Sequence, residues 1–142
     1  MLVRLIYASR ARIAPISHEL IECILGSARK HNPELGITGV LCYSDGIFVQ
    51  VLEGGREQVN QLYARLQRDE RHHDLLLLGY EAIDQRQYSS WTMGRIRLDK
   101  INRSLLLKYS VCGELNPYLV SNCATVSLLN ELASTAAFAQ RD

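Results

Sequence analysis

The order of strand-like and helix-like segments constrains the fold of this chain more than any other feature. Alternating apolar residues predict strands, and apolar residues spaced three and four apart predict helices. The order strand, helix, strand, strand, helix, strand is that of the ferredoxin-like α+β fold, with two helices on one face of the sheet. The predicted strands are 2–8, 37–43, 47–53 and 75–83, with a shorter fifth at 91–98; the predicted helices run from Ser17 to Asn32 and from Val59 to about Asp69.

Local signals set the ends of the first helix and the central hairpin. Ser17 is the expected N-cap, because its hydroxyl can accept a hydrogen bond from the first turn. Pro33 disfavours helical geometry in the residue before it, which predicts a helix end at Asn32. The short turn 44–46 between two strand patterns predicts an antiparallel hairpin.

The chain changes character near residue 100. Residues 1–98 form one predicted domain, and residues 99–142 form a predicted C-terminal helical extension for output or oligomerisation. Helices are expected at 102–109 and 124–139. The apolar residues of this extension should pack on the open face of the sheet or on another subunit, so we expect a homo-oligomer. They are Leu105, Leu106 and Leu107 in the first helix, and Leu129, Leu132, Ala133 and Ala136 in the second.

Charge and composition exclude several classes of function. The net charge of +1 gives no reason to expect nucleic acid as a partner. No apolar run approaches the roughly 20 residues of a membrane helix, and the N-terminus lacks the layout of a signal peptide. The four cysteines are scattered without a C-x-x-C pair, as expected for reduced thiols. We therefore expect a cytoplasmic protein that does not bind membranes.

Tyr7 and Gln50 are polar side chains inside apolar strand patterns. A buried hydroxyl or amide without a partner costs about 1–3 kcal/mol, so each needs a polar group beside it. Each residue alone has an ordinary explanation: a core tyrosine whose hydroxyl reaches water, and a glutamine on an edge strand. Asn32 is equally well explained as a helix C-cap. Trp91 is equally well explained as a half-buried anchor of the sheet.

Other polar residues gather near the ends of the helices. Arg65 and Asp69 are four residues apart and are expected to share a helix face, where a surface ion pair is the ordinary explanation. The neighbouring His72 and His73 invite a metal site, with His18 and His31 as further ligands. Adjacent side chains point apart and no Cys/His pair has ligand spacing, so we expect no metal.

Six motifs occur in order along the chain: Leu5-Ile6-Tyr7-Ala8-Ser9, His31-Asn32-Pro33, Gly36-Ile37-Thr38-Gly39, Phe48-x-Gln50-x-Leu52-Glu53-Gly54, Asp69-Glu70-Arg71-His72-His73 and Trp91-x-Met93. Taken together, they resemble the BLUF domain, the sensor of blue light using flavin, over about residues 2–98. The short single-domain cyanobacterial type is most similar, because the tail segment 107–110 also fits it. Thr92 departs from the serine that is common in the family, which could alter switching rates but not the class.

The resemblance implies an oxidised flavin, FAD or else FMN or riboflavin, held without a covalent bond between the two helices. Gln50 would bridge Tyr7 and the ring, and Asn32 would hold the polar edge of the ring. The remaining implied contacts are the apolar Ile24 and Leu66 on the ring faces, and Arg65, Asp69 and His72 along the outer part of the pocket.

The resemblance further implies a blue-light photoreceptor and not an enzyme. Light would drive electron and proton transfer from Tyr7 through Gln50, and Trp91 or Met93 would relay the change to the tail. Output would pass to a separate signalling protein, response-regulator-like or other. Two alternatives stay open: a flavin-dependent redox enzyme, disfavoured by the missing G-x-G-x-x-G, and a flavin-free ferredoxin-like regulatory module.

Overall fold

The computed structural model of the chain describes residues 1–13, 16–44, 46–97, 103–111, 116–118, 120–134 and 139–140. Its helices and strands alternate in the predicted order, and the hairpin and both crossover helices are present. The elements are β1 (Leu2–Ala11), α1 (His18–Leu35), β2 (Thr38–Ser44), β3 (Ile47–Gly55), α2 (Arg56–Gln67), β4 (His72–Ile83), β5 (Gly94–Arg97), α3 (Arg103–Tyr109), α4 (Asn122–Ala133) and β6 (Ala139–Gln140).

The strands form one mixed sheet in the order β4-β1-β3-β2-β5-β6. The first four strands of this order have the ferredoxin-like arrangement, so the predicted fold class is confirmed. Strand β1 is second from the β4 edge and pairs antiparallel with both β3 and β4. Strand β5 extends the sheet by pairing parallel with β2, and β6 adds an antiparallel edge.

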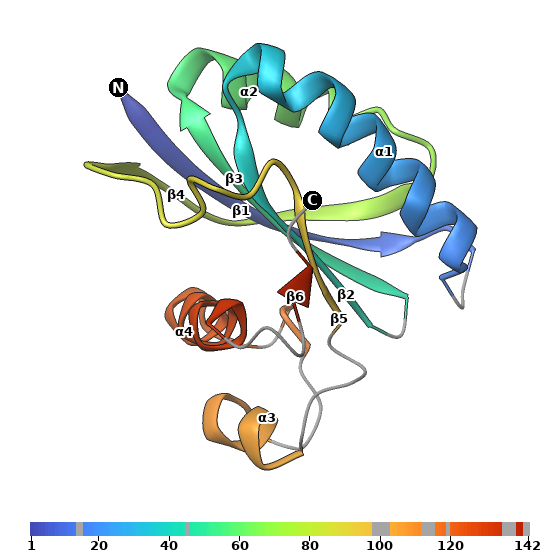
Figure 1. Cartoon of the computed structure of the whole chain (residues 1–142). Coiled ribbons are helices and arrows are strands. Elements are labelled where there is room, and N and C mark those ends of the chain that lie inside the picture. Colours follow the sequence, from blue (N-terminus) through green and yellow to red (C-terminus); the bar gives the residue numbers. More distant parts are fainter. Residues whose placement is uncertain are drawn as a thin grey trace.

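Helices cover both faces of the sheet (Figure 1). Helices α1 and α2 lie on one face, and α4 lies across the other with α3 beyond it. In α4, Leu128, Leu129 and Leu132 are fully buried in the cluster that contains Ile6 and Val51 of the sheet. The tail thus packs on its own sheet, which was one of the two predicted alternatives. The apolar face of the sheet that suggested a homo-oligomer is therefore covered by α4 of the same chain.

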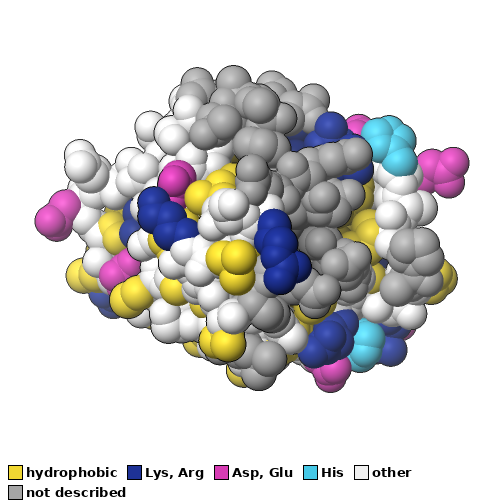
Figure 2. Space-filling view, turned by 90° about the horizontal axis from the view of Figure 1, so that it is seen from below, with side chains coloured by type: hydrophobic (Ala, Val, Ile, Leu, Met, Phe, Trp, Pro, Cys, Tyr) yellow, Lys and Arg dark blue, Asp and Glu magenta, His cyan; other side chains and the backbone are white. Residues whose placement is uncertain are grey.

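The outer surface on the tail side carries apolar side chains in separate spots among charged ones (Figure 2). Leu107 of α3 is one of the exposed apolar residues, at 46% exposure. The described part of the chain contains no helix that combines the length and the apolar character needed to cross a membrane.

Helix α1 begins as predicted and ends later. Ser17 caps it and accepts a hydrogen bond from the Leu20 backbone N–H at 3.1 Å. The predicted end at Asn32 is wrong, because the helix continues through Pro33 to Leu35. The end is set instead by Gly36, whose φ of 67° is left-handed and whose N–H donates to backbone carbonyls of the last turn. Asn32 is consequently not a C-cap.

Four other predicted boundaries were wrong. Helix α2 ends at Gln67 and does not reach Asp69, and β4 begins at His72 rather than at Leu75. Strand β5 begins at Gly94, not at Trp91. Helix α4 ends at Ala133, and residues 139–140 pair with β5, a long-range contact that helical periodicity does not report. Ala136 lies outside the described residues.

Leu129→Ala is expected to lower the free energy of unfolding by about 2–5 kcal/mol, because it opens a cavity between α4 and the sheet. The matched control Leu107→Ala truncates a half-exposed leucine of the same tail and should change it by no more than about 0.5 kcal/mol. Urea unfolding measures both. Equally small effects would contradict the packing of α4 on the sheet.

Candidate functional site

A cavity lies between α1, α2 and the sheet face that these helices cover. All eight side chains that the sequence predicted to bind a cofactor line it: Tyr7, Ile24, Asn32, Gln50, Arg65, Leu66, Asp69 and His72. The other lining residues are Ser27, Ala28, His31, Leu35, Leu41, Phe48, Leu62 and Arg71. The two crossover helices of the fold are what bring residues from such distant parts of the sequence to one place.

Tyr7 and Gln50 face each other at the floor of this cavity. They are direct partners in the antiparallel pairing of β1 with β3, so their side chains point to the same face of the sheet. The Tyr7 hydroxyl donates a hydrogen bond of 2.5 Å to Gln50 Oε1. Each buried polar group therefore meets a partner, and the pair is shielded from water by the helices.

Burial raises the pKa of Tyr7 well above its ordinary value of 10, with Tyr63 and Asp69 raising it further and Arg71 lowering it. The phenol ring of Tyr63 lies 5.3 Å from that of Tyr7. The hydroxyl of Tyr7 consequently keeps its proton at any pH near neutrality and is available only as a donor to Gln50.

Met93 points towards the same site, whereas Trp91 points away from it. Met93 is fully buried and its sulfur accepts a hydrogen bond from Gln50 Nε2 at 3.4 Å. Trp91 packs on the opposite face, in the cluster that contains Leu128 and Leu129 of α4. Its ring lies over Gly94, where an added Cβ would sit 1.8 Å from Trp91 Cε3. Only glycine allows this arrangement.

Asn32 carries an unpaired amide beside the cavity. The side chain is buried, and Nδ2 has no hydrogen-bond partner in the protein. A buried N–H group without an acceptor costs about 1–3 kcal/mol. The donor lies on a residue that lines the cavity, so a ligand with an acceptor at its edge would satisfy it.

His72 is buried and lies deeper than the outer position predicted for it. Its Nε2 is 2.6 Å from the Leu66 carbonyl oxygen and its Nδ1 is 2.8 Å from Ser9 Oγ. Because a carbonyl oxygen can only accept, Nε2 carries the proton, and in the neutral ring Nδ1 accepts from Ser9. His72 thereby joins β1 to the C-terminal end of α2 on the cavity side.

Asp69 pairs with Arg71 and not with Arg65. Asp69 lies beyond the last turn of α2, so the predicted shared helix face was wrong. Hydrogen bonds from the Arg71 guanidinium, at 2.5 to 3.1 Å, hold the pKa of Asp69 below its usual range. Helix periodicity does not predict the pairing of Asp69 with Arg71, because two residues that are two apart in sequence meet in a turn and not on a helix face. Arg65 lines the cavity separately.

The chemistry of the lining suits a flat heterocycle with polar atoms along one edge. Ile24, Phe48 and Leu66 offer apolar contact to ring faces, while Asn32 and Gln50 offer amide donors and acceptors. The unpaired Asn32 amide fits the ring carbonyls and nitrogens of a flavin. Among the described residues, no group of three or more His, Cys, Asp or Glu side chains is placed to hold a metal ion.

Comparisons with known proteins agree with this fit. A family model described as "BLUF: Sensors of blue-light using FAD" matches residues 2–94. The photoactivated adenylate cyclase subunit beta of Euglena longa is 37% identical over 93 residues, which are 65% of this chain and 11% of that protein. The chain thus spans about a tenth of the length of the first curated relatives that it matches.

Two solved structures resemble nearly the whole chain. BlsA in its photo-activated state has a TM-score of 0.82 at 33% identity, covering 93% of this chain and 94% of that chain. The dark-state structure of BlrB, a BLUF protein, has a TM-score of 0.75 at 31% identity, covering 92% of each chain. The similarity therefore includes the tail as well as the sheet with its two helices.

Asn32→Leu is expected to have opposite effects on binding and on stability. Loss of the amide should weaken flavin binding by about 1–3 kcal/mol, measured by fluorescence titration with FMN. Urea unfolding of the flavin-free protein should show unchanged or increased stability, because the unpaired donor is gone. Ser27→Ala, at an exposed position of the lining, is the control and should alter neither. A leucine variant that binds FMN as tightly as the wild type would rule out the assigned role.

Tyr7 should make the flavin-free protein sensitive to alkali. Its pKa is raised on folding, so the folded state keeps a proton that the unfolded state releases near pH 10. The stabilisation that results from the raised pKa is therefore fully present below pH 10 and is lost as the pH rises above it. Above pH 10 the free energy of unfolding of the wild type should fall by about 1.4 kcal/mol per pH unit more than that of Tyr7→Phe. Urea unfolding between pH 8 and 11 measures this difference. If the free energies of unfolding of the two proteins changed in parallel above pH 10, the burial of the phenol would be contradicted.

Proposed function

This chain belongs to the BLUF family, the sensors of blue light using FAD, and we propose that it is a photoreceptor that switches through Tyr7 and Gln50 and signals to a separate protein. Flavin is the cofactor of the family. The observation that carries the proposal is the buried chain of hydrogen bonds from Tyr7 to Gln50 to Met93, next to the unpaired amide of Asn32.

The residues that would hold the flavin are those of the cavity. Ile24 and Leu66 would contact the faces of the ring, and Asn32 and Gln50 would bond to its polar edge. Arg65, Asp69 and His72 complete the lining. When bound and excited by blue light, an oxidised flavin supplies a strong one-electron oxidant.

Tyr7 is the electron donor in this proposal, because a phenol is among the few side chains that such an oxidant can oxidise. An oxidised phenol is a strong acid, so its proton moves along the 2.5 Å bond to Gln50 Oε1. Gln50 then rotates or tautomerises, exchanging the positions of its donor and acceptor. The electron and the proton return to Tyr7, so that every oxidation state is restored and only the hydrogen bonds of Gln50 differ. Thioether sulfur is only a weak acceptor, so the bond from Gln50 to Met93 opposes the rearrangement of the amide only weakly. The orientation of the amide is therefore set by its bond to Tyr7.

We infer that the described chain senses light without catalysing a reaction. The stretch shared with the Euglena longa cyclase is 93 residues long and covers 11% of that protein, and the sensor family model matches residues 2–94 of this chain. The catalytic work of the cyclase is accordingly assigned to the rest of its length.

Output is proposed to leave through the tail. Trp91 is two residues from Met93 and packs against the cluster that holds α4. A change in the hydrogen bonds of Gln50 would thus act on Met93, which is only two residues from the contact of Trp91 with the tail. We propose that this contact presents a light-dependent surface to a response-regulator-like or other signalling protein. A cytoplasmic location and a homo-oligomer stay predictions.

Tyr7→Phe and Gln50→Leu are each expected to abolish the small reversible red shift under blue light while leaving the flavin bound. Phenylalanine lacks the phenol proton, and leucine lacks the amide, yet both keep the apolar volume of the site. Absorption spectra before and after illumination measure the effect. Tyr63→Phe, which removes the neighbouring phenol, is the control and should retain the shift. A normal red shift in either variant would place the photochemistry elsewhere.

A further inference from the structure

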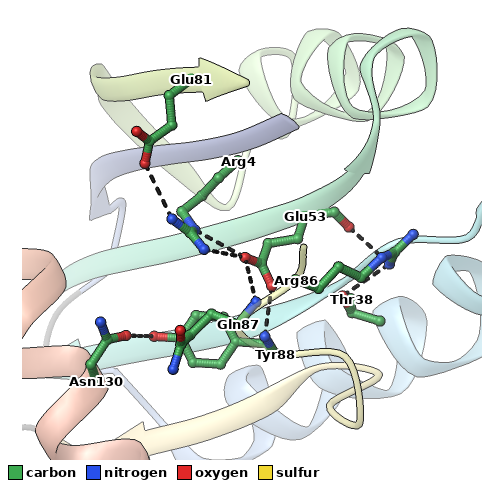
Figure 3. A network of polar contacts seen from close by, with 8 residues as sticks. All are labelled: Arg4, Thr38, Glu53, Glu81, Arg86, Gln87, Tyr88 and Asn130. Atoms are coloured by element: carbon green, nitrogen blue, oxygen red, sulfur yellow. Dashed lines mark hydrogen bonds and ion pairs between the residues drawn. The ribbon is translucent and has the colours of Figure 1, made fainter. Parts of the chain in front are cut away.

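A buried carboxylate on the far side of the sheet has no part in the photochemistry described above. Glu53 is fully buried and lies three residues after Gln50 on β3, so the two side chains point to opposite faces. Figure 3 shows its partners. Arg4 donates two hydrogen bonds to Oε2, at 2.9 and 2.7 Å, and the backbone N–H groups of Gln87 and Tyr88 donate at 3.0 and 2.7 Å.

These contacts fix the connection that leads from β4 to β5. Residues 84–93 contain no helix or strand, so the position of this segment depends on its anchors. Glu53 holds it at Gln87 and Tyr88, and Arg86 adds bonds to Thr38 Oγ1 at 3.0 Å and to the Gly36 carbonyl at 2.7 Å. The backbone of the segment is therefore held in place at Tyr88, three residues before Trp91.

The same anchored segment reaches the photochemical site at one end. The Trp91 N–H donates to the Tyr88 carbonyl at 3.0 Å, and the Trp91 carbonyl accepts from Gly39 at 3.0 Å. Two residues later, the sulfur of Met93 meets Gln50. A displacement of Tyr88 would thus be carried through one turn of backbone to the acceptor of the Gln50 amide.

At its other end the segment reaches the tail. The Tyr88 hydroxyl donates to Asn130 Oδ1 of α4 at 3.1 Å, and its ring packs edge-on against Trp91 with centroids 5.8 Å apart. Tyr88 is thus held by Glu53 through its backbone and holds α4 through its side chain (Figure 3).

We propose that Glu53 is a positioning residue of the light switch: its carboxylate sets the 87–93 segment so that Met93 meets Gln50 while Tyr88 holds Asn130 of α4. This inference rests on the proposed function, since it assigns the link between the flavin site and the tail. A buried ion pair is weak evidence for stability, because apolar residues of similar volume do as well or better. A carboxylate that aligns two backbone N–H groups has a geometric role that an apolar side chain cannot fill.

The test compares rates of dark recovery in flavin-loaded protein. Glu53→Gln removes the charge, and Glu53→Asp keeps the charge but withdraws the carboxylate by one methylene group from the N–H groups of Gln87 and Tyr88. Each is expected to leave the red shift in place and to change the recovery rate by about threefold or more. Glu81→Gln neutralises the exposed partner of Arg4 and serves as the matched control, with wild-type recovery expected.

A double-mutant cycle with Met93→Ala separates positioning from general destabilisation. If Glu53 acts through Met93, its substitutions should have no further effect on recovery in the Met93→Ala background. An undiminished effect there, or wild-type recovery in both Glu53 variants, would overturn the inference. Absence of a red shift in the wild type would instead refute the proposed function.

Tyr88→Phe tests the connection to the tail while leaving the bonds of Glu53 to the backbone intact. Hydrogen exchange of α4 is compared in the dark and under blue light. The variant should lose the light-dependent difference in α4 but keep the red shift, whereas Tyr109→Phe, which removes a tail hydroxyl bonded to Glu131, should keep both. A Tyr88→Phe protein with the wild-type difference in α4 would disprove this connection.

Discussion

The register between β1 and β3 is the constraint on which the rest of the structure depends. It places Tyr7 opposite Gln50 and, three residues away, Arg4 opposite Glu53. Because side chains alternate along a strand, an offset of three sends one pair to the helix side and the other to the tail side. A slip of one residue would exchange the faces of both pairs at once. The Tyr7–Gln50 pair and the Arg4–Glu53 ion pair are thus both set by a single alignment.

Burial of both faces of the sheet specifies this register, and it also determines which partners the polar side chains of these strands can have. Helices α1 and α2 exclude water from the Tyr7 side, and α4 excludes it from the Glu53 side. The buried polar groups of β1 and β3 must then find partners inside the protein. The bonds of Gln50 and Glu53 are therefore few and specific, and a change at one of them must be accommodated by its neighbours.

Patterns local to the sequence predicted much of this architecture. Ser17 as a cap, the hairpin and the set of cavity residues follow from short-range signals or from the six motifs. The end of α1 was missed because Gly36 as a left-handed cap overrides the disfavoured geometry before Pro33. The pairing of Asp69 with Arg71 was missed because it depends on where α2 stops. Which of Trp91 and Met93 faces the cavity depends on the start of β5, which no local pattern fixes.

The unpaired amide of Asn32 has a consequence for the life of the protein in a cell. Folding without flavin leaves a buried donor unsatisfied, and a ligand that binds only the folded state adds stability in proportion to the logarithm of its concentration. Unfolded molecules are removed by proteases, so a modest change in stability alters abundance several-fold. The amount of photoreceptor should therefore follow the supply of flavin, and receptor that lacks its chromophore should be the first to be degraded.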